Sequence, residues 1–379
     1  MDRRTFIKQT GMATAALGMT GTIAATSHSL PKNKLPKWKG FNLLDFFSPD
    51  PAHPRHATTI EELDWIRDWG FNFVRIPIAY PAYLDIDHTK PITPDQVYAL
   101  KEEAVEKIDQ LVAQAHARHL HVSLNLHRAP GYCINAGFHE PYNLWTDPEA
   151  LDAFCYHWNM WAARYKNTSR EKISFDLVNE PTMREDMNDQ FSLRTAVPED
   201  LYRKVAKAAL ETIRKQNPDH LVIADGNNGG NTVVNSLKDL DIAQSCRGYA
   251  PAIISHYKAP WVYKETDTIP TPKWPGQVGD TYLSRALLEE LYAPWIALLQ
   301  EGIGVHCGEC GCYNKTPHDV FLAWFNDLLD ILNEHGIGFG LWEFSGAFGV
   351  MDSGRTDVTY EDWYGRKLDR KFLQLLLKY

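Results

Sequence analysis

Two glutamates, Glu180 and Glu309, follow short apolar runs of the kind that form buried strands. Six further polar or aromatic side chains occupy comparable places near the ends of predicted strands: Arg75, His127, Asn179, His256, Tyr257 and Trp342. When parallel strands close into a barrel, their carboxyl ends converge at one face, so residues far apart in the sequence meet there. Two facing carboxyl groups, one protonated and one ionised, suit the cleavage of a glycosidic bond, because one protonates the departing oxygen while the other attacks the anomeric carbon.

The neighbours of the two glutamates have side chains that this chemistry requires. Arg75 beside Glu309 would keep that carboxyl group anionic through Coulomb attraction. Tyr257 would donate a hydrogen bond to the same group, and His256 would help to set the protonation of Glu180. These roles are what the chemistry demands of such neighbours.

Other residues are expected to contact the sugar that is cleaved. Asn179 would bind its 2-hydroxyl group, while His127 and Trp342 would bind its ring and form the floor of its site. The chain also has 12 Trp and 17 Tyr, whose flat apolar rings can stack on sugars. Four aromatic residues in predicted loops are candidate stacking positions, with packing inside the loop as the alternative for each: Trp145, Trp261, Trp274 and Phe344.

The segments that must position these residues alternate between two patterns. Short apolar runs predict strands over residues 40–44, 71–76, 121–126, 173–178, 221–224, 252–255, 302–306 and 337–341. Longer amphipathic runs predict helices over residues 60–69, 97–118, 148–165, 199–216, 232–237, 283–300, 317–335 and 366–377. The alternation predicts an α/β protein, a single-domain (β/α)8 TIM barrel spanning residues 31–379.

Two local features support this assignment. Thr58 and Thr59 precede a pair of glutamates, and Thr93 precedes a proline, as is typical of helix starts. No glycine-rich phosphate loop follows the first predicted strand, which disfavours a doubly wound open sheet.

The connections after the third, fourth, sixth and eighth strands are long and rich in aromatic residues, and in a barrel they all open onto the catalytic face. They predict a groove for substrate.

Charge and the N-terminal segment indicate partners and location. The net charge is -9 and the pI about 5.9, with no long basic run, so a nucleic-acid partner is not expected. Residues 2–8 resemble a twin-arginine export consensus, and the mild apolar stretch after them is too short to span a bilayer stably. We therefore predict an export signal over residues 1–30. The mature protein would be periplasmic or extracellular, monomeric and not bound to a membrane.

Six cysteines leave two structural alternatives open. Their even number permits disulfides in an oxidising compartment, although their density is low for a disulfide-dependent scaffold. Cys307, Cys310 and Cys312 cluster around Glu309. A zinc site would pair such a cluster with a second, distant ligand pair, which the sequence lacks, so no metal or other cofactor is expected. Cys310 and Cys312 would pack behind Glu309 or pair with each other.

Six short motifs give the sequence a specific resemblance. They are FVRIP at residues 73–77, LNLH at 124–127, LVNEP at 177–181, SHY at 255–257, GECG at 308–311 and LWEF at 341–344. In this order the chain resembles the cellulase-type glycoside hydrolases of family 5. The resemblance implies a (β/α)8 barrel, retention of anomeric configuration and no metal. It makes Glu180 the acid/base and Glu309 the nucleophile, and the six residues named with them the lining around the cleaved sugar.

The preferred substrate is less closely defined by the sequence. The family resemblance favours an endo-β-1,4-glucanase acting on a β-glucan-type polysaccharide or oligosaccharide. The segment 127–131 is similar to the exo-β-1,3-glucanase branch, and residues 132–145 could close one end of the groove, so an exo-acting β-glucosidase or β-1,3-glucanase is an alternative. A β-mannanase is a further one.

Two other classes of protein are weighed against a glycosidase. A carbohydrate-binding barrel without catalysis would have lost Glu180 or Glu309, and neither is replaced. A metal-dependent hydrolase would use His127, His256 and His306. Simple alternation along a strand would turn His306 toward the helices if Glu309 faces the pocket, which disfavours the metal site.

Overall fold

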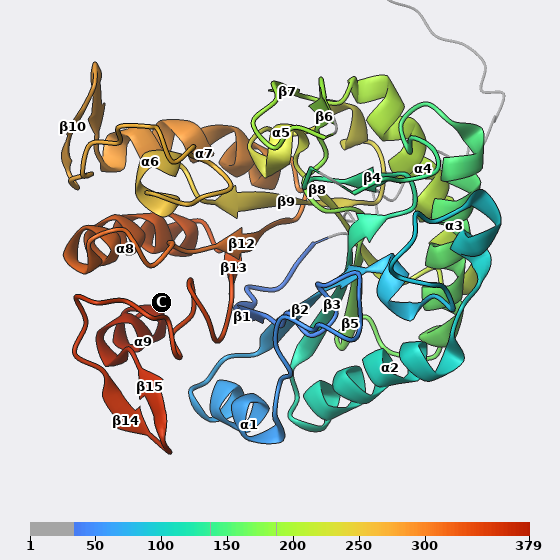
Figure 1. The fold of residues 1–379 in the computed structure, drawn as a ribbon, viewed down its shortest axis with the longest axis horizontal. Helices are drawn as coiled ribbons and strands as arrows, with labels where there is room; N and C mark the ends of the chain where they lie inside the picture. Colours follow the sequence, from blue (N-terminus) through green and yellow to red (C-terminus); the bar gives the residue numbers. More distant parts are fainter. Residues whose placement is uncertain (1–33, 137, 187) are drawn as a thin grey trace, which may run out of the picture. The chain divides into compact units, whose positions relative to one another are not determined.

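The computed structural model describes residues 34–136, 138–186 and 188–379; the predicted export segment lies outside them. Within these residues eight parallel strands form a closed ring in which β2 pairs with β3 to complete the barrel (Figure 1). The ring strands are β1 Lys39–Asn42, β2 Phe73–Ala79, β3 His121–Ala129, β5 Ile173–Asp176, β8 Leu221–Asp225, β9 Ala243–Gly248, β12 Val305–Cys310 and β13 Gly338–Leu341. The predicted (β/α)8 barrel is confirmed.

Helices surround the ring and connect its strands (Figure 1). The longer ones are α1 Ile60–Asp68, α2 Glu102–Ala117, α3 Pro148–Arg164, α4 Glu199–Gln216, α7 Arg285–Gln300, α8 His318–Glu334 and α9 Arg370–Leu377. Short turns of helix are α5 Asn227–Gly230, α6 Ala252–Ser255, η1 Tyr80–Tyr83, η2 Pro94–Tyr98 and η3 Asn235–Leu237. Antiparallel additions are β4 Tyr132–Cys133, which pairs with β3, and the hairpins β6 Met183–Arg184 with β7 Arg194–Thr195, β10 Gly276–Val278 with β11 Thr281–Leu283, and β14 Glu361–Trp363 with β15 Arg366–Leu368.

The two predicted helix starts have different outcomes. Thr59 caps α1: its hydroxyl accepts a bond from the Glu62 backbone, and the Glu62 carboxylate accepts one from the Thr59 backbone. Thr93 and Pro94 instead begin the short η2, and α2 starts only at Glu102. The predicted helix over residues 97–118 therefore starts five residues too early.

The sixth predicted strand, over residues 252–255, is wrong. Those residues form the single turn α6, and the ring strand is β9, which precedes them. β9 escapes a hydrophobic pattern because Gln244, Ser245 and Arg247 are polar, yet all three are buried. The Gln244 side chain donates to the Val234 carbonyl oxygen and accepts from the Val234 N–H, both at 2.9 Å. Its buried amide group therefore has hydrogen-bond partners for both of its polar atoms.

Two predicted helices also differ from the structure. The segment 232–237 belongs to the connection between β8 and β9 and contains only the short η3. The first residues of the segment 366–377 belong to β15, and the helix α9 begins after Asp369, whose carboxylate accepts a bond from the Phe372 backbone at 3.0 Å.

A β-bulge lies in β12, where the pairing register with β9 and β13 shifts beyond Cys307. Cys307 pairs with Cys246, but Arg247 pairs with Glu309 rather than with Gly308. The extra residue changes the alternation, so that His306 faces the interior like Glu309. Its ring lies 4.8 Å from that of Phe73, at the base of the barrel. The prediction that His306 faces the helices is therefore wrong.

The barrel interior has an apolar base and a polar upper part. Along β2, Val74 and Ile76 belong to the main core between ring and helices, whereas Phe73 points inward. With Phe73, the base is filled by a separate cluster: Trp38, Leu221, Ile223 and Ala243. Above this cluster the inward side chain of β2 is Arg75, and the interior becomes a network of charged groups. The packed base thus supports the site from below.

Gly40 provides a test of how closely the ring strands approach each other. A Cβ at this position would lie 1.6 Å from the carbonyl oxygen of Phe73 in the neighbouring strand. We expect Gly40→Ala to lower the free energy of unfolding by about 2–3 kcal/mol or more, because backbone rather than a side chain must move. Urea denaturation measures it. Lys107→Ala, on the exposed face of α2, is the control and should change stability by less than about 0.5 kcal/mol. A change below about 1 kcal/mol for Gly40→Ala would contradict this account.

Candidate active site

Glu180 lies just beyond β5, with its backbone held from two sides. Its N–H donates to Asp225 Oδ2 at 2.9 Å, and its carbonyl oxygen accepts a bond from Tyr132 Oη at 2.6 Å. The residue has φ of 48°, in the left-handed region that side chains with a Cβ disfavour. The two bonds support this strained conformation, which directs the Glu180 side chain toward the barrel axis.

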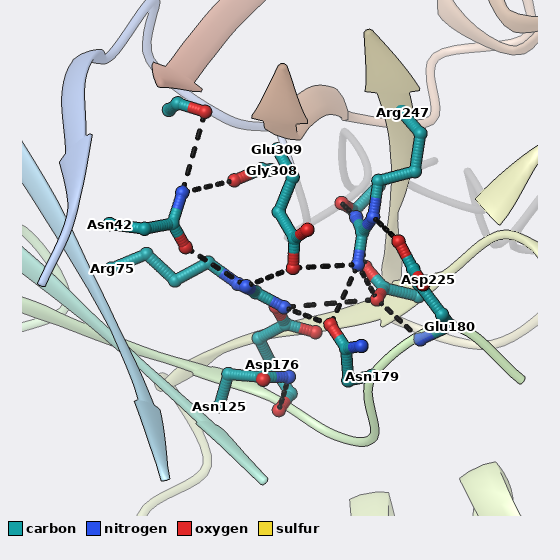
Figure 2. Close-up of polar contacts among 12 residues, drawn as sticks. Asn42, Arg75, Asn125, Asp176, Asn179, Glu180, Asp225, Arg247, Gly308 and Glu309 are labelled. Carbon is teal, nitrogen blue, oxygen red and sulfur yellow. Dashed lines mark hydrogen bonds and ion pairs between the residues drawn. The ribbon is translucent and has the colours of Figure 1, made fainter. Parts of the chain in front are cut away.

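Glu309 approaches the axis from β12 and is surrounded by donors (Figure 2). Arg75 Nη1 donates to its Oε1 at 2.6 Å, and Tyr249 Oη donates to its Oε2 at 3.2 Å. Arg247 Nη2 lies 3.4 Å from Oε1. Two guanidinium groups and one hydroxyl group therefore lie within hydrogen-bond distance of this carboxyl group. This is the environment that a nucleophilic carboxylate needs.

The environment of Glu180 favours a proton instead. Its pKa is raised from 4.5 to about 7, first by burial and then by the negative charge of Glu309. Arg247 opposes the rise, since its Nε donates to Glu180 Oε1 at 2.8 Å. Glu180 is therefore suited to carry a proton in the mildly acidic range.

Two buried arginines connect the carboxylates into one network (Figure 2). Arg75 Nε donates to Asp176 at 2.7 Å, and Arg247 Nη1 donates to Asp225 at 2.9 Å. Both arginines donate to the same atom, Asn179 Oδ1, at 2.9 Å. The pKa of Asp176 is raised to about 7, mainly by burial and secondly by the charge on Asp225.

The predicted floor residues come together beside this network. The rings of His127 and Trp342 are stacked with centroids 5.6 Å apart, and Phe47 packs against both. Burial, followed by the nearby charge of Arg75, lowers the pKa of His127 well below its ordinary value, so this ring is neutral at the pH where Glu180 titrates. The structure thus groups Arg75, His127 and Trp342 with Asn179 and the two glutamates, as the strand-end pattern predicts.

The family model for cellulase, glycosyl hydrolase family 5, matches residues 30–348 of the chain. The chain belongs to this family. Cellodextrinase A of Ruminococcus flavefaciens is 26% identical over 308 residues, which are 79% of this chain and 83% of that protein. Endoglucanase C of Acetivibrio thermocellus is 25% identical over 328 residues, covering 80% and 89%. A crystal structure of a glycoside hydrolase is 36% identical, with a TM-score of 0.80 over 90% of this chain and 99% of that one.

The contacts that the sequence analysis predicted for the motif at residues 255–257 are made by other residues. Tyr257 does not reach Glu309: its hydroxyl pairs with Thr271 Oγ1 at 3.2 Å, and Tyr249 makes the predicted bond instead. His256 follows α6 rather than a ring strand, and its Nδ1 lies 2.8 Å from Ser255 Oγ. The contact with Glu180 predicted for His256 is made by Arg247. Both corrections follow from the wrong strand assignment at residues 252–255.

Four residues of this family 5 site were absent from the sequence-based prediction: Asp176, Asp225, Arg247 and Tyr249. The sequence carried a signal for two of them: Asp176 is the charged residue inside the predicted apolar strand over residues 173–178, and Asp225 directly follows the one over residues 221–224. Arg247 and Tyr249 gave none, because they lie in and just after a strand without an apolar pattern.

One of the four candidate stacking residues has an exposed ring. Trp261 is 37% exposed and meets the rings of Tyr313 and His256 edge-on. The other three are buried, and packing accounts for them. Trp145 packs on Tyr132 and Tyr202, Trp274 donates to Asp327 at 2.9 Å, and Phe344 packs on Phe41 and Trp69.

The cysteines near Glu309 are free thiols. Cys307 and Cys310 are buried with Cys246, and Cys312 donates to the carbonyl oxygen of Ile254 at 3.4 Å. Of the two alternatives, packing behind Glu309 is the one observed. In the described part of the chain no three His, Cys, Asp or Glu side chains are arranged to hold a metal ion. Over the same residues no helix is long and apolar enough to cross a membrane.

The coupling between the two glutamates can be tested by titration. Glu309→Gln removes the negative charge that raises the pKa of Glu180, while burial remains, so this pKa should fall from about 7 by about one unit. Carbon-13 NMR of protein labelled at glutamate carboxyls, followed over pH, measures it. Glu334→Gln, on the surface end of α8, should leave the titration unchanged. An unaltered Glu180 pKa in Glu309→Gln would show that the two groups are not coupled.

Proposed function

We propose that this family 5 glycoside hydrolase cleaves internal β-1,4 bonds of a β-glucan with retention of anomeric configuration. Glu180 is the acid/base and Glu309 the nucleophile. The observation that carries the proposal is that one guanidinium group, that of Arg247, contacts both carboxylates, at 2.8 Å and 3.4 Å. Carboxylates bridged in this way face each other at close range, as the separation of about 5–5.5 Å in retaining enzymes requires.

In the first half of the reaction Glu309 attacks the anomeric carbon. A bond forms between its carboxylate oxygen and that carbon, and the bond to the departing oxygen breaks with its electron pair. Glu180 transfers its proton to that oxygen. The pKa of Glu180, raised to about 7, supplies a protonated acid over the mildly acidic range.

In the second half a water molecule replaces the departed sugar. Glu180, now ionised, takes a proton from the water as its oxygen bonds to the anomeric carbon. The bond between that carbon and Glu309 breaks, and its electron pair returns to the carboxylate. Two inversions at the same carbon give net retention.

Asn179 is suited to bind the sugar 2-hydroxyl group. Its Oδ1 accepts bonds from Arg75 and Arg247, which fixes the orientation of the amide. Its Nδ2 is buried and has no partner among the described residues, so it can donate to a substrate oxygen. A bond to the 2-hydroxyl that strengthens in the transition state contributes to catalysis in retaining glycosidases.

The endo-acting assignment rests on the relatives and on Trp261. The similar Endoglucanase C is named for endo action, and Trp261 offers an exposed ring in the segment that follows α6. Exo action is a second candidate because the segment after β3 is tied down. Glu140 in this segment accepts bonds from Arg128 at 2.5 Å and Tyr80 at 2.6 Å, which suits a fixed wall at one end of the groove.

A product profile distinguishes these possibilities. The purified enzyme is incubated with β-1,4-glucan, β-1,3-glucan, mannan, xyloglucan and aryl β-glycosides. Mixed oligosaccharides from β-1,4-glucan, with the β-anomer appearing first by NMR, are the expected result. Release of a single sugar from chain ends would replace endo with exo action, and products from mannan alone would replace the glucan. Initial α-anomer would overturn the retaining mechanism.

Substitution of each glutamate tests its role. We expect Glu309→Gly and Glu180→Ala each to lose at least about 1,000-fold in kcat on glucan while the fold persists. Azide should restore turnover of an activated aryl β-glycoside in both, with different products. An α-glycosyl azide is expected from Glu309→Gly, where azide enters in a single inversion, and a β-glycosyl azide from Glu180→Ala. The reverse pairing would exchange the two assignments, and full activity in either variant would remove that residue from the reaction.

A further inference from the structure

Arg247 uses its donors on both sides of the active site. Nε donates to Glu180 at 2.8 Å, and Nη2 lies 3.4 Å from Glu309. Nη2 also donates to Asn179 at 2.9 Å, and Nη1 to Ser245 at 3.1 Å. The side chain is 1% exposed, so its charge is shared among these protein groups rather than with water.

The Asp225 carboxylate and two neighbouring glycines fix the position of this guanidinium group. Asp225 accepts bonds from both terminal nitrogens of Arg247, one of them at 2.9 Å, in a fork-to-fork pair. A Cβ on Gly230 would lie 2.5 Å from Arg247 Cγ, and one on Gly308 would lie 3.3 Å from Nη1. Two positions without side chains thus leave room for the arginine between β8 and β12.

We propose that Arg247 is a positioning residue that stabilises the single negative charge passed between Glu309 and Glu180 during turnover. This inference rests on the proposed function. Before the first half-reaction the charge is on Glu309. When the glycosyl bond to Glu309 forms and the proton of Glu180 leaves with the departing oxygen, the charge is on Glu180. Arg247 contacts both carboxylates, so it lies beside the charge in each state.

Arg75 cannot serve both states in the same way. It donates to Glu309 at 2.6 Å, and its other hydrogen-bond acceptors in the described part of the chain are Asp176, Asn42 and Asn179. Once Glu309 is esterified, Arg75 no longer faces an ionised reacting group. The charge on Glu180 is then balanced by Arg247 alone of the two arginines.

The groups that face Glu180 come from four ring strands or the residues that follow them. Those that act on its titration are Arg247 and Tyr249 from β9 and its end, Glu309 from β12, Asp225 from β8, and Tyr132 from β4 beside β3. Among the residues that the structure describes, Arg247 is the cation that donates directly to the Glu180 carboxylate. Its removal should therefore disfavour ionised Glu180, the form that acts as base in the second half-reaction.

The test uses 2,4-dinitrophenyl β-cellobioside, whose leaving group departs without a proton. With this substrate kcat/KM reports glycosylation, while kcat reports hydrolysis of the glycosyl-enzyme when that step is slow. For Arg247→Gln we expect the acid limb of the kcat profile to move up by about one pH unit, because ionised Glu180 is less favoured. At pH 5 kcat should fall about 10-fold, with a smaller loss in kcat/KM, and intact mass spectrometry should detect accumulated glycosyl-enzyme.

Further variants separate this role from a structural one. Arg247→Lys keeps a positive charge without the planar fork, so its limb should shift less than that of Arg247→Gln. If Arg247→Gln fails to fold because Asp225 is left unpaired, Arg247→Gln with Asp225→Asn removes both buried charges. Arg203→Gln, whose guanidinium pairs with Asp239 at the surface of α4, is the matched control and should behave like the wild type.

The outcomes separate the two proposals. If 2-deoxy-2-fluoro cellobiosyl fluoride does not label Glu309 in the wild type, the proposed function fails. If the wild type is labelled but Arg247→Gln loses kcat and kcat/KM equally at every pH, with its acid limb unmoved, Arg247 is only structural and this inference is overturned. A shifted limb with accumulated glycosyl-enzyme supports it.

Discussion

Several carboxyl groups are buried inside this barrel, where an ionised carboxylate would be strongly destabilising without a positive charge beside it. Asp176, Asp225 and Glu309 are all buried, and two guanidinium groups lie between them. Removing one member of such a network leaves an unpaired buried charge. The resulting loss of folding stability is far larger than the net stabilisation that the intact pair provides. The inner positions of β2, β5, β8, β9 and β12 are therefore constrained together.

This constraint also explains why the base of the barrel is apolar. Trp38, Phe73 and their neighbours close the interior below the charged layer. A closed base excludes water from below, which strengthens each ion pair above it. His306 lies in this base with both ring nitrogens unpartnered among the described residues, and burial lowers its pKa to about 3. It contributes a neutral ring to the packing rather than a charge.

The sequence predicted the barrel and most of the site because most ring strands are apolar on the side that faces the helices. Arg75, Asn179 and Trp342 could be found since each interrupts or ends an apolar run. β9 could not be found in that way, because polar residues interrupt it and because Arg247 pairs with carboxylates on other strands, a contact that has no local sequence pattern. The apolar segment 252–255 was chosen in its place, which shifted the prediction from Tyr249 to Tyr257.

The bulge in β12 divides this strand into two parts: the first packs the base of the barrel and the second carries Glu309. Up to Cys307 its side chains alternate in phase with the packing of the base, and from Glu309 onward they follow the phase of the reacting groups. Gly308 is the single residue that joins the two phases. Gain or loss of one residue here would exchange the inner and outer faces of everything beyond it. Insertions and deletions, which the outer loops can accommodate, are therefore not tolerated in this strand. The same limit applies in evolution and in designs that graft loops onto the barrel.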